Sequence, residues 1–229
     1  WHDIFPLMKK RYLFAQVEYF LFYDVWDNGH INENVYAYSN GAGDERTLVF
    51  YNNKYDRASG WIKQSCEYAV KTGSGVQTRS RTISEGLRLT ADENAYCILR
   101  EQRSGLWFVR NSRDICENGM FTSLNGFEAQ VYIDIHQIAD LPDHRYRTLC
   151  ETLAGRGCED LEIEWEEIRY RELYRSLASF IIPIIPGIAS ILHPADAKDT
   201  PQENITAAVK HLLAEAEPSA EAFFKTAVS

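Results

Sequence analysis

The chain has 229 residues, of which 45% are hydrophobic, and its formal net charge is -9. This hydrophobic content predicts a folded chain with a packed core, whereas the acidic surplus argues against a nucleic-acid binder, which needs clustered Lys and Arg. The five cysteines form no Cys-x-x-Cys pair, so they indicate neither a zinc site nor a disulfide framework, and reduced thiols in a cytoplasmic protein are the simplest interpretation.

Neither a secretory leader nor a membrane anchor is expected from the sequence. The start at Trp1 lacks the basic and apolar parts of a secretory signal, and without an initiating Met it suggests a piece of a longer polypeptide. The longest apolar run, Phe180–Leu192, is too short to span a bilayer and is interrupted by Pro183 and Pro186.

The first expected elements are a helix and a strand. Residues Phe5–Val17 are expected to form a helix, with Pro6 at the first helical position, where its missing N–H costs nothing. The aromatic run Tyr19–Tyr23 is typical of a strand, and Asp27–Gly29 supplies a turn that tolerates positive φ.

From there to Asp140, short strands alternate with turn signals and no βαβ rhythm appears, which favours an antiparallel sandwich. The expected strands are Val35–Ser39, Arg46–Asn53, Ile62–Val70, Ile83–Thr90, Ala95–Glu101, Leu106–Arg110 and Ala129–Ile138. In the last of them the strict alternation places Val131, Ile133 and Ile135 in the core and turns Tyr132, Asp134 and His136 outward.

The segment Thr47–Asn53 is expected to lie in the middle of the sheet. Leu48 and Phe50 point to one face, and Val49 and Tyr51 point to the other. A strand that is apolar on both faces belongs in a sheet interior rather than at an edge.

After Pro142 the sequence is expected to be helical. Helices are expected over Pro142–Ala154 and Asp160–Ile182, and the polar stretch Leu192–Gln202 reads as a linker. Thr200–Glu203 is a capping box that starts a last helix with an apolar stripe over Ile205–Leu213. The expected fold is therefore mainly β with an α tail: a helix over residues 1–18, an antiparallel Greek-key β-sandwich over 19–141 and a helical tail over 142–229.

Two groups of polar residues are candidates for a catalytic or metal site. Asp134 and His136 lie on one face of a strand, but no nucleophile motif accompanies them, so a structural pair is favoured. Asp24, Asp27 and Glu33 fail the calcium-loop pattern and are interpreted as turn-forming carboxylates. The sequence predicts no catalytic residue, metal site or cofactor.

Three tryptophans are candidates for binding sugar. Flat aromatic faces can stack on a pyranose ring, which makes Trp26, Trp61 and Trp107 the candidate carbohydrate-binding residues. Burial in the core of a sandwich would produce the same pattern in one sequence.

Three stretches carry a resemblance to a known family. Ile4–Asp24, Asn32–Asn40 and Glu45–Asn53 resemble the α-amylase family (glycoside hydrolase family 13), at the end of its catalytic barrel and in its C-terminal β-sandwich. The resemblance implies that Phe5–Val17 is similar to the last barrel helix. It also implies that the family's catalytic carboxylates lie upstream of this chain, so none of them can be assigned here.

The expected function is that of a noncatalytic C-terminal β-sandwich region of an α-amylase-like glycoside hydrolase, which stabilises or shields a catalytic barrel absent from this chain. A carbohydrate-binding module and a protein–protein assembly module are the alternatives, the latter motivated by the apolar residues of Phe180–Leu192 and Ile205–Leu213. The expected partners are the upstream barrel, α-glucan and a second copy bound through the helical tail, with no nucleic acid and no membrane.

Overall fold

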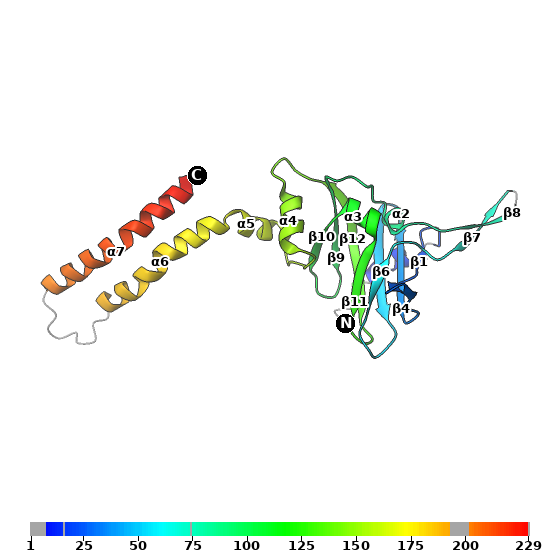
Figure 1. Ribbon diagram of the computed structural model, residues 1–229, viewed down its shortest axis with the longest axis horizontal. Coiled ribbons are helices and arrows are strands. Elements are labelled where there is room, and N and C mark those ends of the chain that lie inside the picture. The colour runs from blue at the N-terminus through cyan, green and yellow to red at the C-terminus, as the bar shows by residue number, and fades with distance from the viewer. Residues whose placement is uncertain (1–7, 16, 74, 193–201, 229) are drawn as a thin grey trace. The chain divides into compact units, whose positions relative to one another are not determined.

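The structure, a computed structural model, describes residues 8–15, 17–73, 75–192 and 202–228. The chain forms two compact units, Trp1–Leu161 and Glu162–Ser229, called here the sandwich unit and the helical unit. Figure 1 shows strands gathered in the first and helices in the second. The expected class, mainly β with a helical C-terminal region, is confirmed.

The sandwich unit contains two larger antiparallel sheets and a separate hairpin. Sheet A has six strands, in the order β1 (Leu21–Tyr23), β4 (Val35–Ala42), β5 (Glu45–Asn52), β12 (Ala129–Ala139), β9 (Ala95–Glu101) and β10 (Trp107–Asn111). Sheet B has four strands, in the order β11 (Met120–Leu124), β6 (Ala58–Ile62), β2 (Trp26–Asp27) and β3 (His30–Ile31). The separate hairpin consists of β7 (Tyr68–Thr72) and β8 (Gly75–Arg79).

One hydrophobic core joins the two sheets. Leu48 and Phe50 of β5 are almost completely buried, and they belong to the same cluster as Ile62 of β6 and Leu124 of β11. Val49, on the opposite face of β5, is also buried. With β4 on one side and β12 on the other, β5 is an interior strand, as its apolar faces predicted.

Two of the expected strands have a different structure. Ile83–Thr90 contains a short helix, α2 (Ile83–Leu87), because Thr82 and Glu85 form a reciprocal capping box. The expected strand Ile62–Val70 is divided between the end of β6 and the start of β7. A further helix, α3 (Ser112–Asn118), and strand β11 follow β10, and neither was expected from the sequence.

A β-bulge changes the orientation of side chains in β12. The register with β9 shifts between Ile133 and His136, and Asp134 has a φ of 55°. As a result Tyr132 and Ile135 both enter the core, whereas Val131 pairs with Val49 on the opposite face and is half-buried. The strict alternation expected for this strand is therefore wrong at Val131 and Tyr132.

The N-terminal segment packs on sheet A. Of the expected helix Phe5–Val17, residues 5–7 and 16 lie outside the described residues, and the described part contains the 3₁₀ helix η1 (Arg11–Phe14). Leu13 is completely buried, and η1 contacts β4 and β5. The hydroxyl of Tyr12 donates a hydrogen bond of 2.7 Å to Glu45 at the start of β5.

The first helix after Pro142 belongs to the sandwich unit. Helix α4 (Arg145–Leu153) contacts β10 and buries Leu149 and Leu153. The division between the two compact units therefore falls after Leu161, beyond the compositional change at Pro142.

The helical unit contains α6 (Arg171–Leu192) and α7 (Gln202–Val228), which contact each other along their lengths. Helix α5 (Leu161–Arg169) ends before α6 begins, so the expected continuous helix Asp160–Ile182 is interrupted at Tyr170. The expected linker falls largely on residues 193–201, outside the described residues. Among the helices that are described, none has the length and apolar composition needed to cross a bilayer.

Candidate functional site

Strand alternation places aromatic side chains on the outer face of sheet B. In β11, Met120, Thr122 and Leu124 are buried, whereas Phe121 is 52% exposed. In β6, Gly60 and Ile62 are buried, whereas Trp61 is 46% exposed. Each strand thus gives one large aromatic ring to the solvent-facing side, because neighbouring residues of a strand point to opposite faces.

The pairing register aligns these side chains in one row across all four strands. Phe121 lies opposite Trp61, Trp61 lies opposite Trp26, and Trp26 lies opposite Ile31. The ring centroids of Trp61 and Phe121 are 5.4 Å apart and the rings are tilted by 55°. Trp26 and Ile31 are 44% and 45% exposed. We call Phe121, Trp61, Trp26 and Ile31 the aromatic row.

Gly60 permits the close approach of β2 and β6 on which the row depends. A Cβ atom at this position would lie 2.7 Å from the carbonyl oxygen of Trp26 and 2.7 Å from a methyl carbon of Val25. No side chain fits at that distance, so glycine allows β2 to pair beside β6. The residue that precedes Trp61 therefore positions Trp26 next to it.

A polar hollow lies at the turn between β2 and β3. Its volume is about 490 Å³, and its lining residues are Asp27, Asn28, His30, Ile31, Asn32, Glu33 and Asn34. Asn28 and Gly29 both have positive φ, which forms the tight turn expected from the sequence. Ile31 belongs both to the aromatic row and to the hollow, so the two features are continuous at this residue.

Trp107 lies apart from the aromatic row. It is on β10, the edge strand of sheet A, where its backbone pairs with Cys158 and the guanidinium of Arg100 lies 5.6 Å from its ring centroid. A carbohydrate-binding module that used both Trp61 and Trp107 would need them on one surface, but they lie on different sheets. The structure instead brings Trp26 and Trp61 together and adds Phe121 and Ile31, while Trp107 belongs to the other sheet.

A second aromatic group occupies the outer face of sheet A. Tyr36 of β4 and Tyr51 of β5 are register partners whose rings stack with centroids 6.3 Å apart. The ring centroids of Phe22 and Tyr36 are 6.2 Å apart, and those of Phe20 and Tyr38 are 5.6 Å apart. These rings pack against one another on the sheet whose strands η1 contacts. We call these five residues the sheet A aromatic cluster.

The polar pair Asp134 and His136 does not form a proton-transfer couple. The Asp134 carboxylate forms an ion pair with Lys10. The Nδ1 atom of the His136 ring lies 2.9 Å from the backbone oxygen of Asp134. The hydrogen bond of this ring atom is thus made to the backbone of Asp134 and not to its carboxylate. The bulge in β12 therefore commits both residues to structural contacts.

Two thiols of the sandwich, the half-buried Cys66 and the buried Cys97, are not activated nucleophiles. Burial, together with a hydrogen bond to Asp24 with an S–O distance of 3.2 Å, raises the pKa of Cys66 to about 11. Burial raises the pKa of Cys97 to about 12. Because the thiolate is the reactive form, a raised pKa keeps both groups mostly in the less reactive thiol form at neutral pH. Within the described part of the chain, no three His, Cys, Asp or Glu residues gather closely enough to hold a metal ion.

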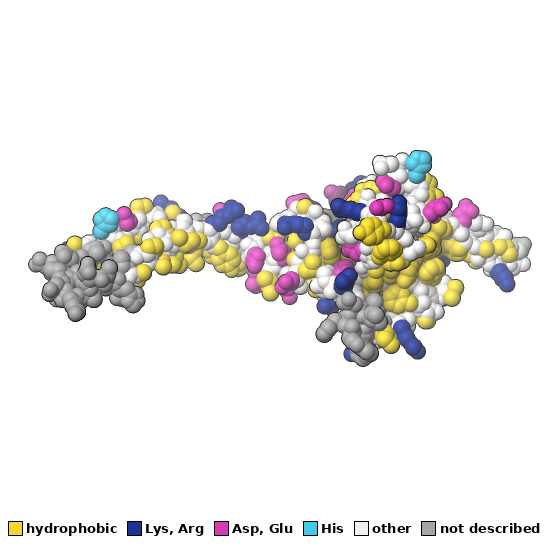
Figure 2. Space-filling model, turned by 90° about the horizontal axis from the view of Figure 1, so that it is seen from below, with side chains coloured by type: hydrophobic (Ala, Val, Ile, Leu, Met, Phe, Trp, Pro, Cys, Tyr) yellow, Lys and Arg dark blue, Asp and Glu magenta, His cyan; other side chains and the backbone are white. Residues whose placement is uncertain are grey.

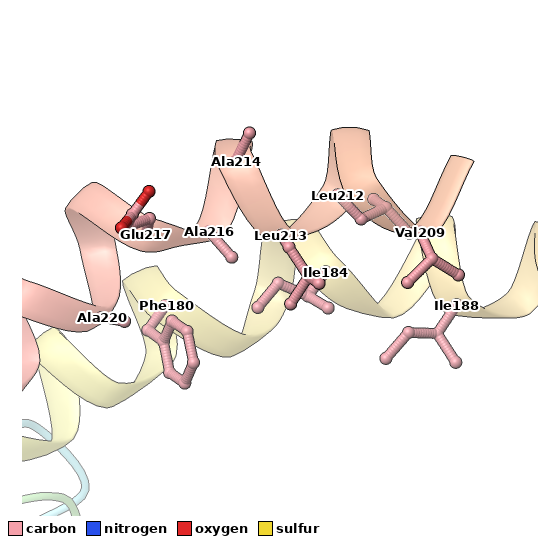
Figure 3. Close-up of a pocket in the computed structure, with 10 residues that line it drawn as sticks. All are labelled: Phe180, Ile184, Ile188, Val209, Leu212, Leu213, Ala214, Ala216, Glu217 and Ala220. Carbon is pink, nitrogen blue, oxygen red and sulfur yellow. The ribbon is translucent and has the colours of Figure 1, made fainter. Parts of the chain in front are cut away.

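The helical unit carries an apolar groove between its two long helices (Figure 3). The groove has a volume of about 700 Å³, and Phe180, Ile184 and Ile188 of α6 face Val209, Leu212 and Leu213 of α7 across it. Figure 2 shows hydrophobic side chains along this helix pair. Ile182 and Leu213 are 64% and 65% exposed.

The fold and its exposed rings define an antiparallel β-sandwich domain with aromatic residues on the outer face of each sheet. No protein-family model matches the chain, and no curated protein matches its sequence. Among solved structures, the chain is similar to AmyP in complex with maltose, at 15% identity and a TM-score of 0.25. A variant of AmyP in complex with maltotriose gives 15% identity and a TM-score of 0.26. Each match covers 45% of this chain and 15% of AmyP.

Proposed function

We propose that this chain is the noncatalytic C-terminal β-sandwich region of an α-amylase-like glycoside hydrolase and that it stabilises or shields an upstream catalytic barrel. The position of the strands that resemble the family carries the proposal. Residues Asn32–Asn40 and Glu45–Asn53 contain most of β4 and all of β5, which are hydrogen-bonded neighbours, and β5 supplies Leu48 and Phe50 to the core. The resembling residues are therefore those that build the sandwich.

The sheet A aromatic cluster supplies the contact surface that this role requires. Tyr36 is 40% exposed and Phe20 is 44% exposed, although their neighbours on the core face are buried. Aromatic side chains with one apolar face and one polar tip are enriched where two protein surfaces meet. Three of its five residues, Tyr36, Tyr38 and Tyr51, lie on β4 and β5, the strands that η1 contacts.

The test compares this chain with the polypeptide that contains it. The chain alone should release no sugar from starch or maltooligosaccharides. The polypeptide with its barrel should hydrolyse them and should lose activity faster on heating when Tyr36 and Tyr51 are replaced by Ser. Tyr55→Ser, at a position that is 83% exposed and outside the cluster, is the matched control. Hydrolysis by the chain alone, abolished by one carboxylate substitution, would contradict the proposal.

Self-assembly through the helical unit is a second candidate function. The favouring observation is the groove between α6 and α7, together with the exposed apolar residues Ile182, Ile185 and Leu213. A second copy presents the same surface, and two such helix pairs can bury these residues as a four-helix bundle.

Sedimentation equilibrium of the full chain tests this second candidate. A dimer is expected, and Leu213→Glu should convert it to a monomer because a carboxylate would enter the apolar contact. Ala207→Glu adds the same charge at an exposed position of α7 outside the groove and should leave the dimer intact. A monomeric parent chain excludes the second candidate.

A further inference from the structure

The aromatic row has the geometry of an extended ligand site rather than of an isolated surface residue. It contains one side chain from each strand of sheet B, all at the same level of the pairing register. Since neighbouring strands lie about 4.8 Å apart, the row extends roughly 14 Å across the sheet. That length suits a short linear oligomer better than a single small ring.

The exposure of the row is not needed for folding. The opposite face of the same strands already contributes Ile62, Met120 and Leu124 to the core. Trp61 and Phe121 each leave about half of their surface in water, next to each other. Large adjacent aromatic side chains on the solvent side of a sheet commonly mark a binding surface.

The polar groups around the row indicate which ligand chemistry fits. Ser59 and Ser123 are register partners at the next outward-facing position, and Arg57 donates a hydrogen bond of 3.1 Å to the Ser123 hydroxyl. At the other end the hollow offers the amides of Asn28, Asn32 and Asn34 and the carboxylates of Asp27 and Glu33. Carboxylate and amide oxygens accept hydrogen bonds from hydroxyl groups, and a negative lining disfavours anionic ligands.

A chain of pyranose rings combines these properties, because each ring has an apolar C–H face and a rim of hydroxyl groups. We propose that the aromatic row binds a neutral oligosaccharide by stacking sugar rings on Phe121, Trp61 and Trp26, with hydroxyl groups directed into the hollow beyond Ile31. The choice of an α-linked glucan rests on the proposed function, whereas the choice of a pyranose chain rests on the row and the hollow alone.

Calorimetry and tryptophan fluorescence of the full chain with maltoheptaose test the proposal. Maltoheptaose should bind and change the fluorescence, and Phe121→Ala and Trp61→Ala should each weaken binding about tenfold because a stacked ring is lost. Phe127→Ala is the matched control: Phe127 is 57% exposed, close to the 52% of Phe121, but pairs with Tyr55 outside the row. It should bind as the parent chain does.

The outcomes separate the site from the function. Circular dichroism checks that each variant folds. If Trp61→Ala does not fold, the binding measured for Phe121→Ala alone tests the site. Absence of binding of both maltoheptaose and cellohexaose, or equal weakening by Phe127→Ala, overturns the site. Binding of the β-linked cellohexaose with no binding of maltoheptaose keeps the row as a sugar site and overturns the α-glucan assignment. If the chain binds maltoheptaose but the Tyr36 and Tyr51 substitutions do not speed the heat inactivation of the polypeptide with its barrel, the proposed function is rejected and the sugar site is kept.

Discussion

The side-chain amide of Asn52 donates a hydrogen bond of 2.9 Å to the backbone carbonyl of Asn125. The same nitrogen donates a hydrogen bond of 2.8 Å to the carbonyl of Asp56, and Asn52 is completely buried. Its side-chain oxygen accepts a bond from the backbone N–H of Lys54. One residue at the end of β5 thus joins the loop that leads to β6 with the turn that precedes β12. The role of this Asn is structural.

Replacing Asn52 with Ala should lower the free energy of unfolding by about 1–3 kcal/mol, because the carbonyl groups of Asp56 and Asn125 lose a donor and the N–H of Lys54 loses its acceptor. Chemical denaturation measures the change. Asn53→Ala is the matched control, because the adjacent side chain is exposed and Asn53 contacts Asn34 through its backbone. Equal effects of the two substitutions would contradict the structural role of Asn52.

The contacts of Asn52 illustrate what the sequence can and cannot predict. The apolar pattern of Thr47–Asn53 predicts an interior strand, because burial on two faces leaves a local signature. The contact with Asn125 has no local signature, since its partner lies far along the chain. The aromatic row is similar: Trp26 and Trp61 are visible as candidates, but only the register of distant strands makes them neighbours.

Two misses in the candidate site have specific causes. Phe121 was not considered because β11 was not expected, although the alternation of apolar and polar residues over Met120–Leu124 carries a strand signal. Trp107 is a candidate together with the other tryptophans because the sequence shows its residue type. The sequence does not show that its strand, β10, joins sheet A rather than sheet B. In both cases strand pairing decided the result.

Gly86 should be intolerant of any side chain. A Cβ atom there would lie 2.3 Å from the Tyr23 hydroxyl oxygen and 2.8 Å from the Ser39 hydroxyl oxygen, and those two oxygens share a buried hydrogen bond of 2.6 Å. Gly86→Ala is expected to lower the free energy of unfolding by about 1–3 kcal/mol through overpacking.

The control for Gly86 is Gly73→Ala, where an added Cβ meets nothing within 4 Å. Thermal unfolding followed by circular dichroism should show a lower Tm for Gly86→Ala and little change for Gly73→Ala. A neutral effect at Gly86 would mean that Tyr23 and Ser39 can separate without cost.

Helix α4 should contribute to the stability of the sandwich unit. Leu149 is completely buried in a helix that contacts β10, so Leu149→Ala removes packed methyl groups and should lower the free energy of unfolding by about 2–5 kcal/mol. Leu141→Ala, at a residue that is 40% exposed, should have a much smaller effect. Denaturant titration measures both, and a small effect at Leu149 would show that α4 is dispensable for the sandwich.

Glu101 should make stability depend on pH in the acidic range. Burial alone would raise the pKa of its carboxyl, but hydrogen bonds with Ser104, Arg103 and Val131 outweigh burial and hold the pKa below its ordinary value. The backbone N–H groups of Ser104 and Arg103 donate to its two oxygens at 2.6 and 3.1 Å, in the turn between β9 and β10. The folded protein therefore favours the ionised form.

The sign of the effect follows from linkage. As the pH falls, the unfolded chain binds a proton at Glu101 near the ordinary pKa of about 4.3, whereas the folded chain binds it only at a lower pH. The stabilisation from the ionised carboxylate is therefore fully present above the unfolded-state pKa and is lost as the pH falls through the folded-state pKa. Glu101→Gln should thus lower the free energy of unfolding by about 1–2 kcal/mol near pH 7 and by less near pH 3. Glu67→Gln removes the same charge from an exposed side chain and controls for the net charge of the chain. Denaturation of both variants and the parent at the two pH values measures the difference, and a Glu101 effect that grows on acidification would contradict the assigned direction.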